Sequence, residues 1–292
     1  MDEQKKIDKV VTSILNGTEK DLGKKYASTL KKIRGELAEL SAKYKTLTWT
    51  ELQKYDRFTK LEGVLSKHLA TLNTQTRKAL YAAQEAAYKE SFYRTAFAIQ
   101  KDIGVQLSYK LINPNTIEAA ITNPLVKGSL SKLNATLRGN VNQAITQGLL
   151  QGKSYRDISL GVKDAMQTTA NHAMTIARTE THRCQNKGSM DSAEVAQEQG
   201  VKFKKVWVST LDGNTRDSHQ SLDGEKRDLD EAFSNGLQYP GDPAGGAAEV
   251  INCRCTTIQE VVGHEIKQRR SRDEGMIENI TYKEYAKKKG WA

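Results

Sequence analysis

A heptad seam between residues 18 and 47 is the sequence feature that most constrains the fold. Its apolar side chains alternate steps of four and three residues, and they are Tyr26, Leu30, Ile33, Leu37, Leu40, Tyr44 and Leu47. This spacing predicts a helix that packs along its length against a partner helix. The partner belongs either to the same chain or to another copy, so the 18–47 seam also predicts a surface for self-association. Thr18, with Asp21 three residues later, predicts the start of this helix.

Further helical patterns follow the seam. Thr48 and Glu51 repeat the cap signal and predict a second helix with inward leucines up to Leu72, and residues 76–103 predict a third. After two Asn-Pro breaks, helical spacing returns in residues 130–149, in a helix capped by Ser154, and in residues 171–199. The last of these helices has a face of small residues, which predicts close approach of another element, and its Glu180 is expected to pair with Arg178 or Arg183.

The period changes after residue 200. Residues 201–208 (VKFKKVWV) are rich in β-branched and aromatic side chains and predict a strand, and residues 250–258 predict a second strand. The predicted fold is mainly α, with an elongated helical N-terminal region followed by an α+β domain that has long helices and a small β element. The predicted division is a basic helical region at 1–128, an α+β domain at 129–262 and a short basic tail at 263–292.

Basic residues are concentrated in the first half of the chain. The net charge is +10; residues 1–170 hold 27 Lys and Arg against 16 Asp and Glu, whereas residues 171–292 hold 18 against 19. A lysine-rich surface that faces only solvent accounts for this charge, and so does a surface that binds a polyanion such as double-stranded DNA. No apolar run reaches the roughly 20 residues that span a bilayer, so no membrane partner is expected. Three cysteines, two of them in a C-x-C, favour a reducing compartment.

Residues 207–258 gather the side chains with the most chemistry. In a strand, Cys253 and Cys255 would share one face with their Cα atoms roughly 7 Å apart, where two thiolates can converge on a soft divalent metal ion. The predicted metal site comprises Cys253, Cys255, His219 and Asp212, with zinc as a structural cofactor. Other candidates for the fourth ligand are Asp217, Cys184 and His264. Two half-buried core cysteines beside a histidine that bonds a backbone carbonyl are the alternative without a metal.

A catalytic reading of the same span has weaker support. His219 with Asp212, Asp217 and Asp223 would form the site of a metal-dependent hydrolase acting on nucleic acid. Carboxylates beside glycine-rich turns are also ordinary turn chemistry, and a C-x-C in a strand is a poor position for an exposed nucleophile. We therefore expect a protein that is not an enzyme, with the hydrolase as the alternative.

Four short segments, in this order, carry a resemblance to a known family. They are residues 148–155 (GLLQGKSY), 177–181 (ARTET), 212–219 (DGNTRDSH) with 222–224 (LDG), and 252–255 (NCRC). Together with Trp207 and the Pro-Gly loop before the cysteines, they resemble the phage Mu F-like minor head proteins, also called phage head morphogenesis proteins. The resemblance covers residues 130–258.

The resemblance implies a low-copy minor capsid protein of a tailed phage. Such a protein is expected to associate with the portal, and with scaffold or capsid protein, during head assembly or genome delivery and ejection. It would bind double-stranded DNA through the basic N-terminal half, and lie in the virion head near the portal after assembly in the host cytoplasm. Some relatives carry a toxin domain after this region. About 30 residues follow Ile258 here, too few for a catalytic domain, so a toxin is not expected.

Overall fold

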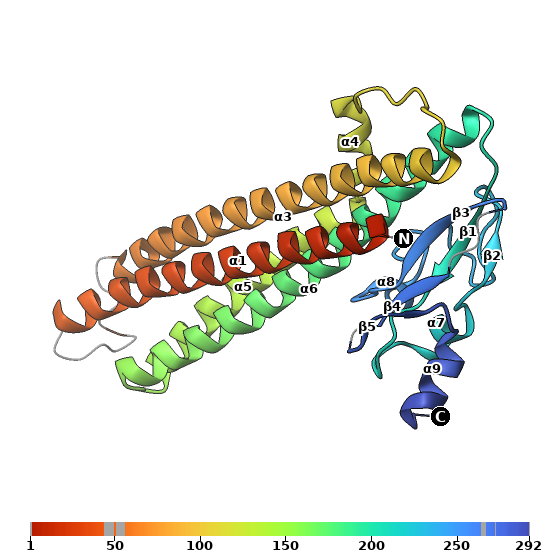
Figure 1. Ribbon diagram of the computed structural model, residues 1–292. Helices are drawn as coiled ribbons and strands as arrows, with labels where there is room; N and C mark the ends of the chain where they lie inside the picture. Colours follow the sequence, from red (N-terminus) through yellow and green to blue (C-terminus); the bar gives the residue numbers. More distant parts are fainter. Residues whose placement is uncertain (1, 44–49, 51–55, 264–266, 272, 292) are drawn as a thin grey trace. The chain divides into compact units, whose positions relative to one another are not determined.

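Long helices dominate the computed structural model, which describes residues 2–43, 50, 56–263, 267–271 and 273–291 (Figure 1). The helices before the first strand are α1 (Asp2–Lys43), α3 (Arg57–Ile103), α4 (Pro114–Ile121), α5 (Pro124–Leu150) and α6 (Tyr155–Glu198). The strands are few and short, so the predicted mainly α fold with a small β element is confirmed. None of the described helices combines the length and the apolar character that a membrane span requires.

Several helix ends differ from the predicted ones. Helix α1 begins at Asp2, so the predicted start at Thr18 is wrong; buried Ile7 and Val11 show that the apolar spacing extends upstream of the cap signal. Helix α3 runs without a break through residues 72–76, and α6 joins two predicted helices. In each case the apolar face continues, and packing outweighs a weak terminal signal. Tyr44 and Leu47 of the predicted seam lie outside the described residues, and so do Thr48 and Glu51, the predicted start of the second helix.

The chain forms two compact units, and each unit is discontinuous in sequence. One unit comprises residues 1–16, 82–123 and 177–292, and the other comprises residues 17–81 and 124–176. We call them the β-containing unit and the helical unit. The step at residues 127–129 lies inside α5. Segments on both sides of residue 128 contribute to each of the two units. The linear division of the chain into 1–128, 129–262 and 263–292 stays a prediction.

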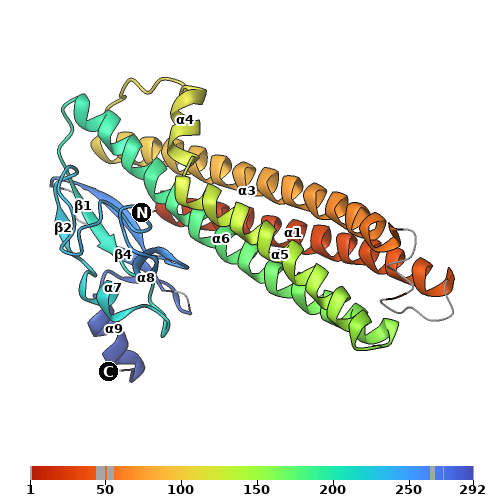
Figure 2. The same ribbon diagram turned by 180° about the vertical axis from the view of Figure 1, so that it is seen from behind.

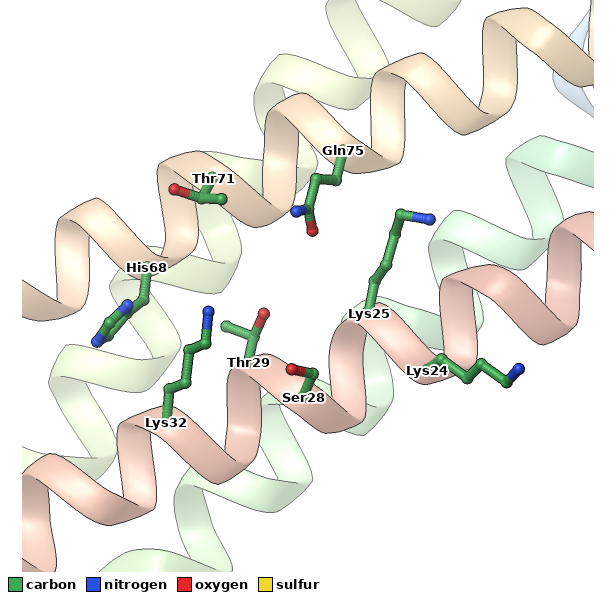
Figure 3. A pocket seen from close by; sticks show the side chains of 8 residues that line it. All are labelled: Lys24, Lys25, Ser28, Thr29, Lys32, His68, Thr71 and Gln75. Carbon is green, nitrogen blue, oxygen red and sulfur yellow. The ribbon is translucent and has the colours of Figure 1, made fainter.

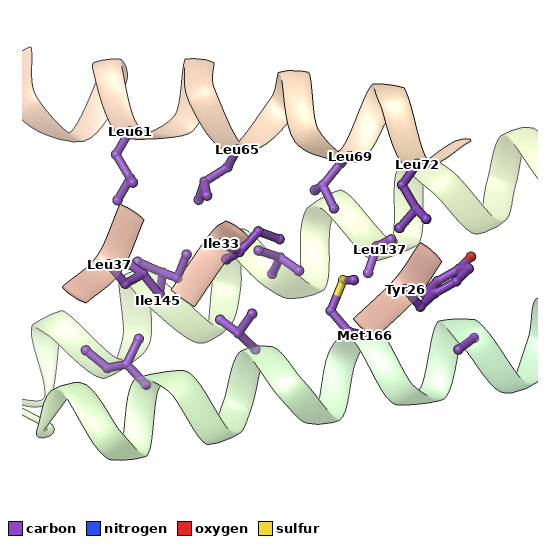
Figure 4. Packing of buried hydrophobic residues seen from close by; sticks show 14 of the residues in the cluster. Tyr26, Ile33, Leu37, Leu61, Leu65, Leu69, Leu72, Leu137, Ile145 and Met166 are labelled. Carbon is purple, nitrogen blue, oxygen red and sulfur yellow. The ribbon is translucent and has the colours of Figure 1, made fainter. Parts of the chain in front are cut away.

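The helical unit has a single apolar core formed by segments of four helices, α1, α3, α5 and α6. These segments run side by side in both views (Figure 1 and Figure 2), and their inward side chains interdigitate (Figure 4). Ile33 and Leu37 of the α1 seam are buried in one cluster with Leu65 of α3 and Val162 of α6. The seam therefore packs on helices of the same chain, and each fully buried aliphatic side chain contributes about 1.5–3 kcal/mol.

In the β-containing unit, α3 and α6 approach each other closely. A Cβ atom added at Gly188 of α6 would lie 2.4 Å from the carbonyl oxygen of Tyr88 in α3. The Tyr88 hydroxyl donates to the Asp191 carboxylate at 2.7 Å, one turn further along α6. The prediction that the small-residue face of α6 admits a close neighbour is confirmed at Gly188.

The β element follows α6. Its sheet has the order β2-β1-β3, formed by β1 (Phe203–Val208), β2 (Lys226–Arg227) and β3 (Thr256–Val261), with both pairings antiparallel. Two short helices, α7 (Asp217–Ser221) and α8 (Ala247–Val250), lie in the connections. The predicted first strand is confirmed. The second begins at Thr256 rather than at residue 250, so the cysteines precede it.

The segment predicted as a short basic tail contains folded structure. Strands β4 (Gln268–Ser271) and β5 (Gly275–Glu278) form an antiparallel hairpin, and α9 (Tyr282–Lys289) follows with a capping box between Thr281 and Glu284. Tyr282 and Tyr285 of α9 are buried in a cluster with Leu211. The last helix therefore packs on the loop that follows β1.

The close approach of α3 and α6 makes a prediction for Gly188→Ala. The new methyl group would push against backbone atoms of Tyr88, which cannot rotate away, so we expect the free energy of unfolding to fall by about 1–3 kcal/mol. Gly35→Ala on α1 is the matched control, because a Cβ atom there meets nothing within 4 Å. Urea unfolding followed by circular dichroism measures both. Equal stability of the two variants would contradict the close packing.

Candidate functional site

Three metal-ligand side chains come together in the β-containing unit: His219 of α7, and Cys253 and Cys255 of the segment between α8 and β3. Each sulfur lies 3.5 Å from the His219 Nδ1 atom, and the three donor atoms lie within 4.8 Å of one another. The residues are 1%, 5% and 2% exposed, respectively. The structure therefore gathers three of the four residues that the sequence predicts for a metal site. We call these three residues the Cys–His cluster.

The local backbone explains how both sulfurs reach one nitrogen. Asn252 has a φ of 56°, in the left-handed region that asparagine tolerates, and it ends the extended path expected for residues 250–258. The prediction that Cys253 and Cys255 lie in a strand is therefore wrong. The chain leaves α8 with the Cys253 N–H donating to the Val250 carbonyl at 3.2 Å, and only then enters β3.

Glu249 completes the surroundings of the histidine. Its Oε2 atom lies 2.8 Å from His219 Nε2, on the opposite edge of the imidazole ring from the two sulfurs. A carboxylate that bonds one ring nitrogen fixes which nitrogen carries the proton and orients the other. Sequence analysis missed Glu249; its only signal was a carboxylate four residues before the first cysteine, which a surface glutamate also gives.

The electrostatics of the cluster separate the two thiols. The hydrogen bond between the two cysteines, and then the bond to His219, hold the pKa of Cys255 well below its usual range. The same cysteine–cysteine hydrogen bond, together with burial, raises the pKa of Cys253. Burial lowers the pKa of His219, but Cys255 and Glu249 outweigh burial, so this pKa is raised. Cys255 is therefore the more acidic of the two thiols.

Aromatic side chains close the cluster from the sheet side. Trp207 of β1 is fully buried, and its ring meets the His219 imidazole edge-on, with centroids 5.2 Å apart. Phe233 also packs edge-on against Trp207, with ring centroids 5.1 Å apart. Trp207, Phe233, Cys253 and Cys255 belong to one apolar cluster. This packing excludes water from the sulfur side of the imidazole.

Asp212, the fourth predicted ligand, points to a different partner. Its carboxylate accepts two bonds from the Arg254 guanidinium, at 2.5 and 3.1 Å, and one from the Asn214 backbone N–H at 3.0 Å. Asp212 and Asp217 are not among the donors of the Cys–His cluster. Cys184 lies on α6, where its sulfur accepts from Arg183 at 3.4 Å, and His264 lies outside the described residues.

Asp223 is held in the same way by a second arginine. Arg269 of β4 reaches its carboxylate at 2.5 and 2.8 Å, and both side chains are almost fully buried. The backbone N–H groups of Ser209 and Tyr282 also donate to Asp223, at 2.7 and 2.5 Å. Asp223 therefore ties the loop after β1 to the hairpin and to α9.

Helix α6 holds the cysteine segment in place. The Thr179 hydroxyl accepts from the Asn252 N–H at 3.0 Å. The Asn186 amide donates to the Cys255 and Pro240 carbonyls, at 3.1 and 3.0 Å, and accepts from the Thr257 N–H at 3.1 Å. Sequence analysis missed Asn186, since a polar residue on a long helix gives no signal of its own.

The predicted pairing of Glu180 is confirmed for Arg183. The guanidinium Nε donates to the Glu180 carboxylate at 2.7 Å, and both side chains are buried. The remaining nitrogens of Arg183 donate to the carbonyls of Ala120 and Ile121 at the end of α4. Glu180 of the 177–181 segment therefore has a structural role, because it holds the Arg183 side chain that binds the end of α4.

A second feature lies in the helical unit, between α1 and α3 (Figure 3). It is an open cleft of about 310 Å³, lined by Lys24, Lys25, Ser28, Thr29, Lys32, His68, Thr71 and Gln75. We call it the basic cleft. Acidic side chains contact two of these residues: Lys25 pairs with Asp21, and the His68 ring lies 3.2 Å from the Glu36 carboxylate. The lining carries amines, hydroxyls, an imidazole and an amide, and no carboxylate.

Comparison with known proteins identifies relatives. Residues 139–258 match the family model described as Phage Mu protein F like protein. The chain is 32% identical to the Minor head protein GP7 of Bacillus phage SPP1, over 98% of this chain and 97% of that relative.

Other relatives are longer than this chain. The chain is 29% identical, over 89% of its length, to the NAD(+)–arginine ADP-ribosyltransferase EFV of Enterococcus faecalis, but it covers 55% of that protein. It is 28% identical to protein YqbB of Bacillus subtilis, over 62% of this chain and 60% of YqbB. No solved structure matches the chain.

The buried Asp223–Arg269 pair leads to a prediction about stability. Asp223→Ala would leave a buried guanidinium without its carboxylate and two backbone N–H groups without their acceptor. We therefore expect the free energy of unfolding to fall by about 3–5 kcal/mol. Asp228→Ala removes a carboxylate from an exposed pair with Lys204 and should change stability little. Chemical unfolding of both variants measures the difference, and similar losses would show that the Asp223 pair has no special role.

Proposed function

The chain belongs to the phage Mu F-like family of minor head proteins, and we propose that it is a portal-associated component of the phage head that binds double-stranded DNA. Virion localisation follows from the family. The finer parts of the proposal are a position near the portal, contact with scaffold or capsid protein during assembly in the host cytoplasm, and a part in head assembly or genome delivery.

One observation carries the family assignment. The match to the SPP1 minor head protein extends over 98% of this chain and 97% of the relative. The helical unit, the Cys–His cluster and most of the C-terminal hairpin and helix therefore fall within one collinear relationship. A match limited to a short motif would leave the basic first half of the chain outside the relationship. This match includes the basic first half.

The basic cleft supports the DNA part of the proposal. Lys25 and Lys32 extend from α1 toward α3, where Gln75 faces them, and Lys24 extends from the same stretch of α1 away from α3 (Figure 3). Ammonium, hydroxyl and amide donors are the groups that contact phosphate oxygens without reading base sequence. Because flexible lysines act as point charges, binding here would be strongly salt-dependent and indifferent to sequence.

The contacts of the Asp side chains support a role without catalysis. A metal-dependent hydrolase needs carboxylates directed at the reacting centre, whereas Asp212 and Asp223 are bound by Arg254 and Arg269. This chain covers 55% of the ADP-ribosyltransferase named among the relatives, so we do not assign the activity of that protein to this chain. We therefore propose a structural and DNA-binding role, and no observation favours the hydrolase.

The proposal is tested by replacing Lys24, Lys25 and Lys32 with glutamine in one variant. We expect weaker binding to double-stranded DNA of any sequence, because three phosphate contacts would be lost. A plot of log K against log salt concentration, measured by fluorescence anisotropy, should become shallower by about 2–3.

The matched control replaces Lys202, Lys283 and Lys287 with glutamine, which removes the same charge from exposed positions in residues 171–292. This variant should keep the salt slope of the wild type. Equal losses in the two variants would reduce the effect to overall charge, and absence of DNA binding by the wild type would refute this part of the proposal. Co-purification with the portal protein tests the remaining part.

A further inference from the structure

We propose that His219, Cys253 and Cys255 bind a soft divalent metal ion, zinc by the nature of the donors, and that Glu249 orients the imidazole for it. The His219 Nδ1 atom and the two sulfurs would be the ligands. The metal would connect α7 to the segment that precedes β3. This inference goes beyond DNA binding and portal association, and it depends on neither.

The nitrogen–sulfur distances within the Cys–His cluster match those of a tetrahedral zinc site. Zn–N and Zn–S bonds are about 2.0–2.1 and about 2.3 Å, so a nitrogen and a sulfur on one tetrahedral zinc ion lie about 3.6 Å apart. In the structure, the His219 Nδ1 atom lies 3.5 Å from each sulfur. The nitrogen is therefore spaced to share one ion with each sulfur, and all three donors lie within 4.8 Å of one another.

A hydrogen bond alone accounts for only part of this arrangement. The Nδ1 atom carries at most one proton, yet two sulfurs lie at the same distance from it, and both cysteines are nearly fully buried. A bound ion would contact both sulfurs at once. It would also neutralise the charge of the thiolates that coordinate it inside the apolar cluster of Trp207, Phe233 and the two cysteines.

Glu249 supplies the supporting contact that metal-bound histidines commonly have. With Nε2–H donating to the carboxylate at 2.8 Å, the proton is placed on Nε2 and the Nδ1 lone pair is directed at the sulfurs. Helix α8 presents Glu249 and the following turn presents Cys253, so one short segment supplies both a ligand and the group that orients another ligand.

The described residues provide three protein ligands, since Asp212 is bound by Arg254 and stands outside the cluster. We assign the ion a structural role, because the cluster lies within an apolar core and joins two segments of the β-containing unit.

The test begins with wild-type protein, purified without a metal-affinity tag or chelator. Inductively coupled plasma mass spectrometry should find one zinc ion per protein chain. A Cys253→Ser, Cys255→Ser double variant and His219→Ala should each lose the zinc. Cys184→Ser is the control, because Cys184 is a buried cysteine that is not part of the cluster and its replacement should leave the zinc content unchanged.

A second measurement keeps the proposal falsifiable if the ligand variants fail to fold. Glu249→Ala retains all three ligands and removes only the orienting carboxylate, so competition with a chromogenic chelator should show zinc affinity reduced about 10–100-fold. Glu118→Ala, on the exposed side of α4, should leave the affinity unchanged. Cobalt added to metal-free wild type should produce the absorption of thiolate-bound Co²⁺. Wild type that neither contains zinc nor takes up zinc or cobalt would overturn the proposal.

Discussion

The position of the Cys–His cluster depends on the buried side-chain amide of Asn186. This one group bonds the carbonyls of Cys255 and Pro240 and the N–H of Thr257, and so joins α6 to the loop and to the start of β3. Removal of this amide would leave three buried backbone groups without a hydrogen-bond partner. Each unpaired group would lower the free energy of unfolding by about 1–3 kcal/mol. The close contact at Gly188, half a turn further along α6, gives the helix a fixed neighbour in α3. The cysteine segment is therefore held against a rigid element.

The aspartates between residues 212 and 223 illustrate how structure and function compete as explanations of a motif. Asp212 pairs with Arg254, which lies between the two cysteines, and Asp223 pairs with Arg269 of β4. A buried ion pair adds little net stability compared with apolar packing, but the loss of one partner is costly. Pairs of this kind specify which loops meet. The Asp-rich motif therefore arranges the loops around His219, while the sulfurs and Glu249 surround its imidazole.

The periodicity of the sequence predicted the helices and the strand that repeat a pattern over several residues. It did not predict features that depend on one residue, such as the course of the backbone at the cysteines. The α1 seam, the small-residue face of α6 and strand β1 were predictable because each spans several turns or alternations. The start of α1 was not, because the Thr18 signal contributes less than the burial of Ile7 and Val11. The route of the cysteine segment depends on the left-handed Asn252, and the partner of His219 on Glu249, four residues before Cys253. Neither has a period, so neither could be found from spacing.

The two candidate features differ in their physics, and this difference separates their roles. The basic cleft in the helical unit is open, and its lysines interact with solvent and counterions, so any ligand there competes with salt. The Cys–His cluster in the β-containing unit is buried, and protons and chelators compete for its donors much more than salt does. Because no residue is shared between the cleft and the cluster, each can be disabled by substitutions that leave the other intact. A defect in head assembly caused by cleft variants would then report on contact with a polyanion, and one caused by cluster variants on the integrity of the β-containing unit.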